Sequence, residues 1–185
     1  MRVLKPRWWA GALLAFALGL PVSAQQAAAL PAEVLQAAGE LSLRGQSRLR
    51  VWGFEVYDAT LWAAPGLAAG AVGAGPAALE LRYLRDFSAR DLAQRSIQEM
   101  RRSGELAAER EQRWLEEMLR VFPDIRAGDR LLGLHRPGVG ASFWFNGRFR
   151  GEVRDPEFAQ RFFGIWLSPQ TSQPVLRRAL LGQQP

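Results

Sequence analysis

Residues 45–62 run Gly45-Gln-Ser-Arg-Leu-Arg-Val-Trp-Gly-Phe-Glu-Val-Tyr-Asp-Ala-Thr-Leu-Trp62. The pattern predicts two strand segments bent around Gly53, and it places two arginines among two tryptophans and a tyrosine. Strands that only fill a core seldom carry arginine beside tryptophan. The mixture therefore favours a pocket whose wall is mostly apolar and that is cationic at one point.

Three strands are expected in the first half of the chain. Residues 40–50 and 51–63 form the first two, and a Gly/Ala-rich stretch, residues 65–76, is expected to be a flexible connection. Residues 79–83 alternate between apolar and charged side chains, a period of two that is typical of a half-buried strand.

A three-stranded meander is expected later in the chain, over residues 130–136, 141–145 and 148–153. Asn146-Gly147 predicts a type I′ turn between its last two strands. In the last strand, alternation places residues 149, 151 and 153 on one face and residues 148, 150 and 152 on the other. One face of the sheet would then be covered while the other meets solvent.

Helices are expected after each group of strands. Ser88 is expected to cap the first helix, and residues 105–122 form the second. Asp155-Pro156 begins the third, and residues 174–181 form the fourth, with Ser172 as its cap. This order indicates an α+β domain with helices packed on one face of an antiparallel sheet.

The N-terminus has the composition of a secretory signal peptide. Arg2, Lys5 and Arg7 form a positive segment, residues 8–20 an apolar one, and Val22-Ser23-Ala24 supplies small residues before a cleavage site. A membrane anchor is the alternative, but the apolar run is shorter than the roughly 20 residues that span a bilayer. We expect export, to the periplasm, with cleavage after residue 24.

Beyond residues 1–24 we expect a loose lead over residues 25–39 and a single domain over residues 40–182, with no integral membrane segment.

Cleavage removes three positive charges and no acid, so the formal net charge falls from +6 to +3. The remaining charge is carried by arginine without any run of like charge, which does not indicate a nucleic-acid partner. The chain has no cysteine, which excludes disulfides and cysteine-ligated metals.

The sequence contains no familiar catalytic constellation. Its single histidine, His135, cannot form a two-histidine metal site, and no cluster of Asp and Glu suggests another. No G-x-S-x-G elbow and no phosphate-binding glycine loop is present. We therefore expect no metal, no cofactor and no serine or cysteine nucleophile.

Six short motifs follow one another in a distinctive order. They are Gly45-x-x-Arg48, Trp52 to Trp62, Leu84-Arg85-Asp86-Phe87, Asn146-Gly147, Phe162-Phe163-Gly164-Ile165-Trp166 and Pro174-x-Leu176-Arg177-Arg178. The ordered set resembles the chalcone isomerase-like family over residues 40–182. The resemblance implies an open-faced β-sandwich, in which a curved antiparallel sheet carries a helical layer on one face and a ligand cleft lies between them.

The resemblance also implies where a ligand would be held. In the plant enzymes of the family, an arginine holds a phenolate while a threonine and a tyrosine hydrogen-bond the carbonyl on which negative charge develops. Arg48 matches that arginine best, with Arg50 as the alternative, and Tyr57 falls where the enzymes have the threonine. Residues 103–111, where the second tyrosine would lie, have no aromatic hydroxyl, and residues 164–165, where a late-helix donor would lie, have no donor.

Each donor missing from such a site costs about 2–4 kcal/mol of transition-state stabilisation, so chalcone cyclisation is not expected. An arginine with a tyrosine resembles instead the fatty-acid-binding relatives, in which these residue types hold a carboxylate above an apolar pocket. The candidate ligand-binding residues are Arg48, Tyr57, Arg50 and Trp52, and the expected partner is a small apolar or carboxylate ligand.

A structural interpretation of the same residues stays open. The tryptophans at 52, 62, 114 and 166 can be core residues, and Arg48 and Arg50 can be solvated edge residues that cover tryptophan with their stems. In a regular strand Tyr57 also faces away from Arg48. Both reach one cleft only if Gly53 is a bulge, so the clamp depends on a break in the strand there.

Three functions are therefore compatible with the sequence. The preferred one is an exported protein that binds a small apolar acid or lipid-like molecule. The second is an isomerase or intramolecular lyase acting on a phenolic or enone substrate. The third is a structural or partner-binding envelope protein with a filled core.

Overall fold

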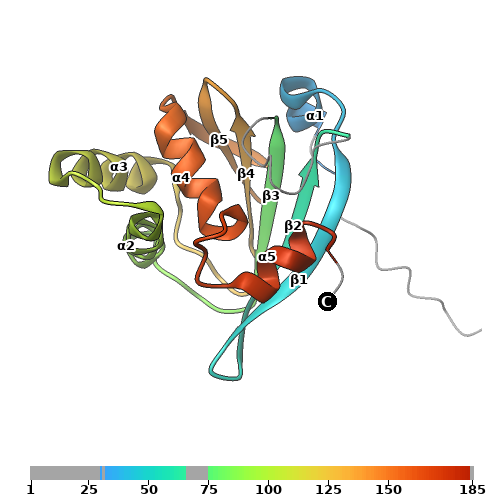
Figure 1. Ribbon diagram of the computed structural model, residues 1–185, viewed down its shortest axis with the longest axis horizontal. Helices are drawn as coiled ribbons and strands as arrows, with labels where there is room; N and C mark the ends of the chain where they lie inside the picture. The colour runs from blue at the N-terminus through green and yellow to red at the C-terminus, as the bar shows by residue number, and fades with distance from the viewer. Residues whose placement is uncertain (1–29, 31, 66–74, 184–185) are drawn as a thin grey trace, which may run out of the picture.

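The computed structural model describes residue 30, residues 32–65 and residues 75–183. Within this part of the chain, a six-stranded antiparallel sheet with its strands in chain order carries helices across one face, here called the inner face (Figure 1). The predicted signal peptide and residues 66–74 of the predicted flexible connection lie outside the described residues. No helix of the described part is long and apolar enough to cross a membrane.

The strands pair with their sequence neighbours throughout, as a meander. They are β1 (Ser42–Val51), β2 (Phe54–Ala63), β3 (Ala77–Tyr83), β4 (Arg130–Arg136), β5 (Gly140–Phe145) and β6 (Arg148–Val153). The helical elements are α1 (Ala32–Ala38), α2 (Ala89–Met100), the short 3₁₀ helix η1 (Arg101–Ser103), α3 (Ala108–Val121), α4 (Pro156–Leu167) and α5 (Pro174–Leu180). The expected α+β class and open curved sheet are confirmed.

The main core lies between the inner face and the helices, and aromatic rings dominate it. The Phe162 ring of α4 stands 5.3 Å from that of Phe143 on β5, 5.9 Å from Phe122 and 5.4 Å from Trp166. Each of these buried side chains removes roughly 150–250 Å² of largely apolar surface from water, which makes α4 the central support of the helical layer.

A second, smaller cluster covers part of the opposite, outer face of the sheet. Val34 of α1 is fully buried there, against Trp62, Leu134 and Trp144. Residues 25–39 were expected to be a loose lead, but residues 32–38 form helix α1, whose Val34 side chain packs into this cluster on the outer face.

Turn and cap residues explain most element boundaries. Ser88 accepts a hydrogen bond from the Asp91 amide at 3.1 Å and caps α2, as expected. Asn146-Gly147 forms the predicted tight turn, with both φ angles positive (48° and 79°). The expectation for α5 was wrong, since its N-terminal cap is Gln173 rather than Ser172.

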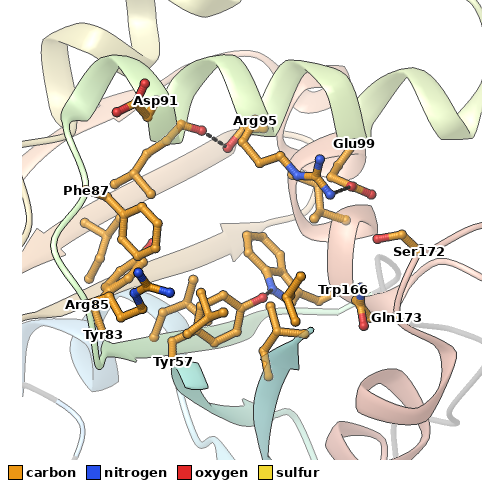
Figure 2. A pocket seen from close by; sticks show the side chains of 18 of the residues that line it. Tyr57, Tyr83, Arg85, Phe87, Asp91, Arg95, Glu99, Trp166, Ser172 and Gln173 are labelled. Atoms are coloured by element: carbon orange, nitrogen blue, oxygen red, sulfur yellow. Dashed lines mark hydrogen bonds and ion pairs between the residues drawn. The ribbon is translucent and has the colours of Figure 1, made fainter. Parts of the chain in front are cut away.

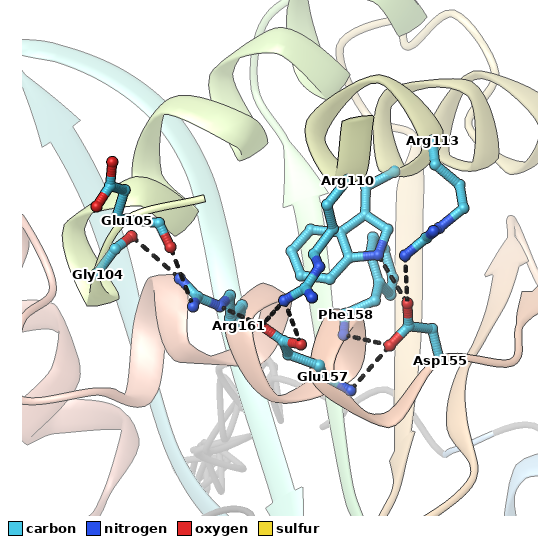
Figure 3. Close-up of polar contacts among 9 residues, drawn as sticks. Gly104, Glu105, Arg110, Arg113, Asp155, Glu157, Phe158 and Arg161 are labelled. Carbon is cyan, nitrogen blue, oxygen red and sulfur yellow. Dashed lines mark hydrogen bonds and ion pairs between the residues drawn. The ribbon is translucent and has the colours of Figure 1, made fainter. Parts of the chain in front are cut away.

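Asp155 joins α3 to the start of α4 (Figure 3). Its carboxylate accepts hydrogen bonds from the amides of Glu157 and Phe158, both at 3.0 Å, and from Trp114 Nε1 of α3 at 2.8 Å. Arg161, one turn further along α4, donates to the carbonyls of Gly104 and Glu105 in the segment before α3. These contacts hold α4 against α3 and the segment that precedes it.

The face alternation expected for the last strand was wrong at Phe149. Phe143 pairs with Gly151, but the next residue, Trp144, pairs with Phe149, so that Arg150 is an extra residue in β6. This bulge sends the Phe149 ring to the outer face, where it stands 5.4 Å from Trp144.

The last helix lies directly on the first strand. A Cβ atom on Gly45 of β1 would stand 2.1 Å from the Ala179 carbonyl oxygen of α5, so only glycine permits this approach. The C-terminal helix therefore packs against backbone rather than side chains at this point.

We expect the buried histidine to make the fold sensitive to mild acid. Burial lowers the pKa of His135 below its ordinary value of 6.5. Just below pH 6.5 the imidazole is therefore protonated in the unfolded chain and neutral in the folded chain. Stability from this group is complete above pH 6.5 and falls below it, by up to about 1.4 kcal/mol per pH unit. Urea unfolding between pH 7 and pH 5 should show a flatter pH dependence for His135→Gln.

The comparison with the variant is needed because Glu80 acts in the opposite direction. Burial raises the pKa of its carboxyl, so protonation of Glu80 favours the folded state as the pH falls. Equal pH dependence in the wild type and in His135→Gln would contradict the assignment to His135.

Candidate functional site

A cavity of about 650 Å³ opens between the inner face of β1–β3 and helix α2, with α4 along one side (Figure 2). Its wall is mainly apolar. The sheet contributes side chains such as Leu49 and Leu81, α2 contributes Leu92, and α4 contributes Ile165 and Trp166. A volume of this size is typical of sites for small organic ligands.

The geometry of the β1–β2 hairpin decides which of its side chains reach the cavity. Trp52 and Gly53 form a two-residue turn with φ angles of 49° and 82°. Leu49 pairs with Tyr57, whereas Arg50 pairs with Glu55, so Val56 is an extra residue in β2. The extra residue breaks the period of two, and both Val56 and Tyr57 line the cavity.

The two arginines predicted to hold the ligand lie elsewhere. Arg48 pairs with Asp58, to which Nε donates at 2.6 Å, and Nη1 is 2.8 Å from Glu55. Arg50 also binds Glu55, at 2.8 Å. Hydrogen bonds to Asp58 and Glu55 raise the pKa of Arg48, and neither arginine is among the residues that line the cavity.

The structure therefore does not bring Arg48 and Tyr57 together. The break at Gly53 is a hairpin turn between two strands rather than a bulge within one, and the bulge at Val56 leaves Arg48 on the far side from Tyr57. Trp52, the fourth candidate, lines the mouth of the cavity but is 94% exposed. The core interpretation is thus wrong for Trp52 and right for Trp62 and Trp114, whereas Trp166 is buried and also lines the cavity.

Tyr57 is the predicted site residue that the structure places inside the cavity. Its hydroxyl oxygen accepts a hydrogen bond from Trp166 Nε1 at 2.8 Å, which ties β2 to α4. Burial raises the pKa of the phenol, so Tyr57 stays protonated near neutral pH. Its own proton has no recorded acceptor among the described residues and is available to a ligand.

Tyr83 on β3 is a second tyrosine in the cavity, and sequence reasoning did not single it out. Its ring meets that of Tyr57 edge to face, with 5.8 Å between centroids, and burial raises its pKa as well. Within the described part of the chain its hydroxyl makes no recorded hydrogen bond. Two neutral phenols therefore stand side by side in an apolar wall.

The cations of the cavity are Arg85 and Arg95, and they differ in their partners. Arg95 lies 2.5 Å from Glu99, one turn away on α2, so its charge is largely compensated. Arg85 stacks over the Phe54 ring at 5.0 Å and forms no recorded ion pair with another described residue. Figure 2 shows its guanidinium directed into the space that Tyr57 and Tyr83 border.

Three acids line the cavity, the exposed Asp86 and Asp91 and the buried Glu99. One carboxylate oxygen of Glu99 faces Arg95, while the other has no hydrogen-bond partner among the described residues and lies 3.8 Å from Arg102 Nε. No group of three or more potential metal-ligating side chains occurs in the described residues. Arg95 and Glu99 have the i, i+4 spacing of an ordinary surface ion pair. From the sequence alone they could therefore not be recognised as cavity residues.

Comparison with known proteins agrees with this architecture. The family model described as chalcone isomerase-like matches residues 23–182. The chain belongs to the chalcone isomerase-like family. The match begins before residue 40, where the sequence resemblance began, and includes α1.

Two similar proteins can be named for this chalcone isomerase-like protein. A fatty-acid binding protein of Arabidopsis thaliana has a similar structure, with a TM-score of 0.60 and 12% identity, over 78% of this chain and 88% of that one. At that identity the likeness shows the fold alone. An uncharacterized protein of Haemophilus influenzae is 38% identical over 72 residues, which are 39% of this chain and about a third (35%) of that protein.

We expect the two cavity tyrosines to respond differently to loss of their hydroxyls. Tyr57→Phe leaves the buried Trp166 N–H without its acceptor, which costs about 1–3 kcal/mol of unfolding free energy. Tyr83→Phe is the matched control and should cost less than Tyr57→Phe, because the Tyr83 hydroxyl has no recorded protein partner to leave unpaired. Urea unfolding measures both, and an equal loss in the two variants would contradict the assigned hydrogen bond.

Proposed function

We propose that this protein binds a small apolar acid, with the apolar part in the cavity and the acid group at Arg85. The observation that carries the proposal is the Arg85 guanidinium, which forms no ion pair with another described residue and stands on a mainly apolar cavity of about 650 Å³. Arg85 is exposed and solvated in the free protein, and beside the apolar wall it is placed to bind a ligand that brings a negative charge.

The neighbouring groups support the same ligand chemistry. Tyr57 and Tyr83 are protonated at neutral pH, and burial raises their pKa further, so each can donate a hydrogen bond to an anion but neither can repel one. An arginine fork matches a carboxylate with two parallel hydrogen bonds, and a tyrosine hydroxyl adds a third. The fold shared with a fatty-acid binding protein is consistent with this class of ligand.

Two further parts of the proposal rest on other observations. The positive and apolar segments of residues 1–24 support action after export, to the periplasm. A filled structural core is disfavoured, because the cavity lies beside Tyr57 rather than being closed by side chains.

Isomerisation of a phenolic or enone substrate is the second candidate. It is favoured by the pair of tyrosines, whose rings meet edge to face in the cavity wall, since two phenol donors beside one cavity can stabilise charge that develops on a carbonyl oxygen. Turnover of an enone followed by absorbance, and lost in both Tyr57→Phe and Tyr83→Phe, would support catalysis. Binding without turnover would contradict catalysis and support ligand binding as the function.

We expect Arg85→Gln to weaken binding of a long-chain fatty acid about tenfold to a hundredfold, because a charge-assisted hydrogen bond contributes about 1.5–3 kcal/mol. Titration with a fluorescent polyene fatty acid in vesicle-free buffer measures the affinity. The methyl ester of the same acid should bind wild type and variant alike, since it carries no charge for Arg85 to hold.

Arg48→Gln is the matched control. This arginine lies on β1 and binds Asp58 and Glu55 outside the cavity. Its replacement should leave fatty-acid affinity unchanged. A larger loss in Arg48→Gln than in Arg85→Gln would overturn the assignment of the acid group, and absence of any saturable binding would overturn the proposed function.

A further inference from the structure

The tip of the β1–β2 hairpin projects beyond the rest of the sheet and the helical layer (Figure 1). Its side chains are large and apolar, yet they are exposed. Trp52 in the turn is 94% exposed, and Phe54, which follows the turn, is 61% exposed. A tryptophan left in water at the end of a projecting hairpin is unusual, since aromatic side chains are normally the first to be buried.

The backbone at this tip is also unfavourable for tryptophan. The turn at Trp52-Gly53 has φ angles of 49° and 82°, and the turn at Asn146-Gly147 has nearly the same pair, 48° and 79°. Positive φ at the first position favours asparagine, aspartate or glycine. The turn at Asn146-Gly147 follows that rule. The turn at Trp52-Gly53 does not, since its first position holds a tryptophan in a strained backbone conformation.

The tip is continuous with the cavity. Val51, Trp52 and Phe54 belong both to the hairpin end and to the lining of the cavity, and Arg85 lies over the Phe54 ring. An apolar molecule moving along these side chains would pass from the tip to the interior without crossing an ion pair. Glu55, which follows Phe54 in the chain, is bound by Arg48 and Arg50, and the acids Asp86 and Asp91 lie further along the cavity wall.

The size of the tip argues against a second protein as its partner. Two aromatic rings offer on the order of 300 Å² of apolar surface, well below the roughly 800 Å² per partner that a stable interface buries. A bilayer surface requires no such area or complementary shape. Tryptophan is enriched at the boundary between lipid headgroups and acyl chains, and arginine beside it reaches the phosphates with its long stem.

We propose that the hairpin tip docks this protein on a phospholipid bilayer, with Trp52 and Phe54 inserted at the headgroup boundary and the cavity mouth facing the lipid. Arg85 lies over the Phe54 ring, and Arg50 lies two residues before Trp52 in the chain, so both reach lipid phosphates in the docked protein. The docking surface goes beyond ligand binding, because it acts on the bilayer itself and places the cavity where apolar acids are dissolved.

The test is vesicle flotation of the whole protein with ligand-free vesicles of phosphatidylethanolamine and phosphatidylglycerol. Trp52→Asn is the informative variant, since asparagine suits the turn and should keep or raise the melting temperature while removing the ring. We expect it to lower vesicle binding about tenfold or more. Lipids brominated near the headgroup should quench tryptophan fluorescence in the wild type and less in this variant.

Val139→Asn is the control variant. Val139 is 44% exposed in the turn between β4 and β5, which the meander places at the opposite end of the sheet, and its replacement should leave flotation unchanged. Equal flotation of wild type and Trp52→Asn, or no flotation of the wild type, would overturn the proposal. Self-association that is lost in Trp52→Asn, without vesicle binding, would overturn it in favour of a second copy of the chain.

The two proposals fail separately. Fatty-acid titration is done without vesicles, and flotation is done without fatty acid. If flotation depends on Trp52 but the protein binds no fatty acid, the docking proposal stands and the proposed ligand binding is wrong. Fatty-acid binding without flotation would do the reverse.

Discussion

The register of the first hairpin is the constraint on which the site depends. Because side chains on a strand alternate between faces, one extra residue changes the direction of everything beyond it. The bulge at Val56 is such a residue, and it turns both Val56 and Tyr57 toward the cavity while Arg48 and Asp58 stay paired outside. The same hairpin therefore presents an apolar, phenolic wall on one side and a row of ion pairs on the other.

The helical layer completes the site by the way it distributes charge. Helix α2 supplies Arg95 together with its own acid, Glu99, so this cation carries little net charge into the cavity. Arg85, in the segment that leads into α2, has only an aromatic ring beneath it. The Trp166–Tyr57 hydrogen bond keeps α4 against β2 on the same side. An apolar cavity with one available cation follows from these three placements.

Local sequence patterns predicted the elements better than the site. Asn146-Gly147, Ser88 and Asp155 act through their own backbone neighbours, so their turn and caps could be predicted from sequence alone. The bulges at Val56 and Arg150 arise from pairing between strands, which no single strand reveals. For that reason Arg48 was placed at the ligand and Arg85, a residue in a motif already noted, was not.

The contact between Gly45 and α5 links the first strand of the domain to its last helix. These two elements lie about 130 residues apart in the chain, so β1 is synthesised long before α5. The part of β1 that α5 covers therefore stays exposed until nearly the whole chain has been made. The contact between β1 and α5 is therefore completed late in synthesis. A fragment that lacks its C-terminus cannot mimic the folded protein, because it exposes the strand on which the hairpin is built.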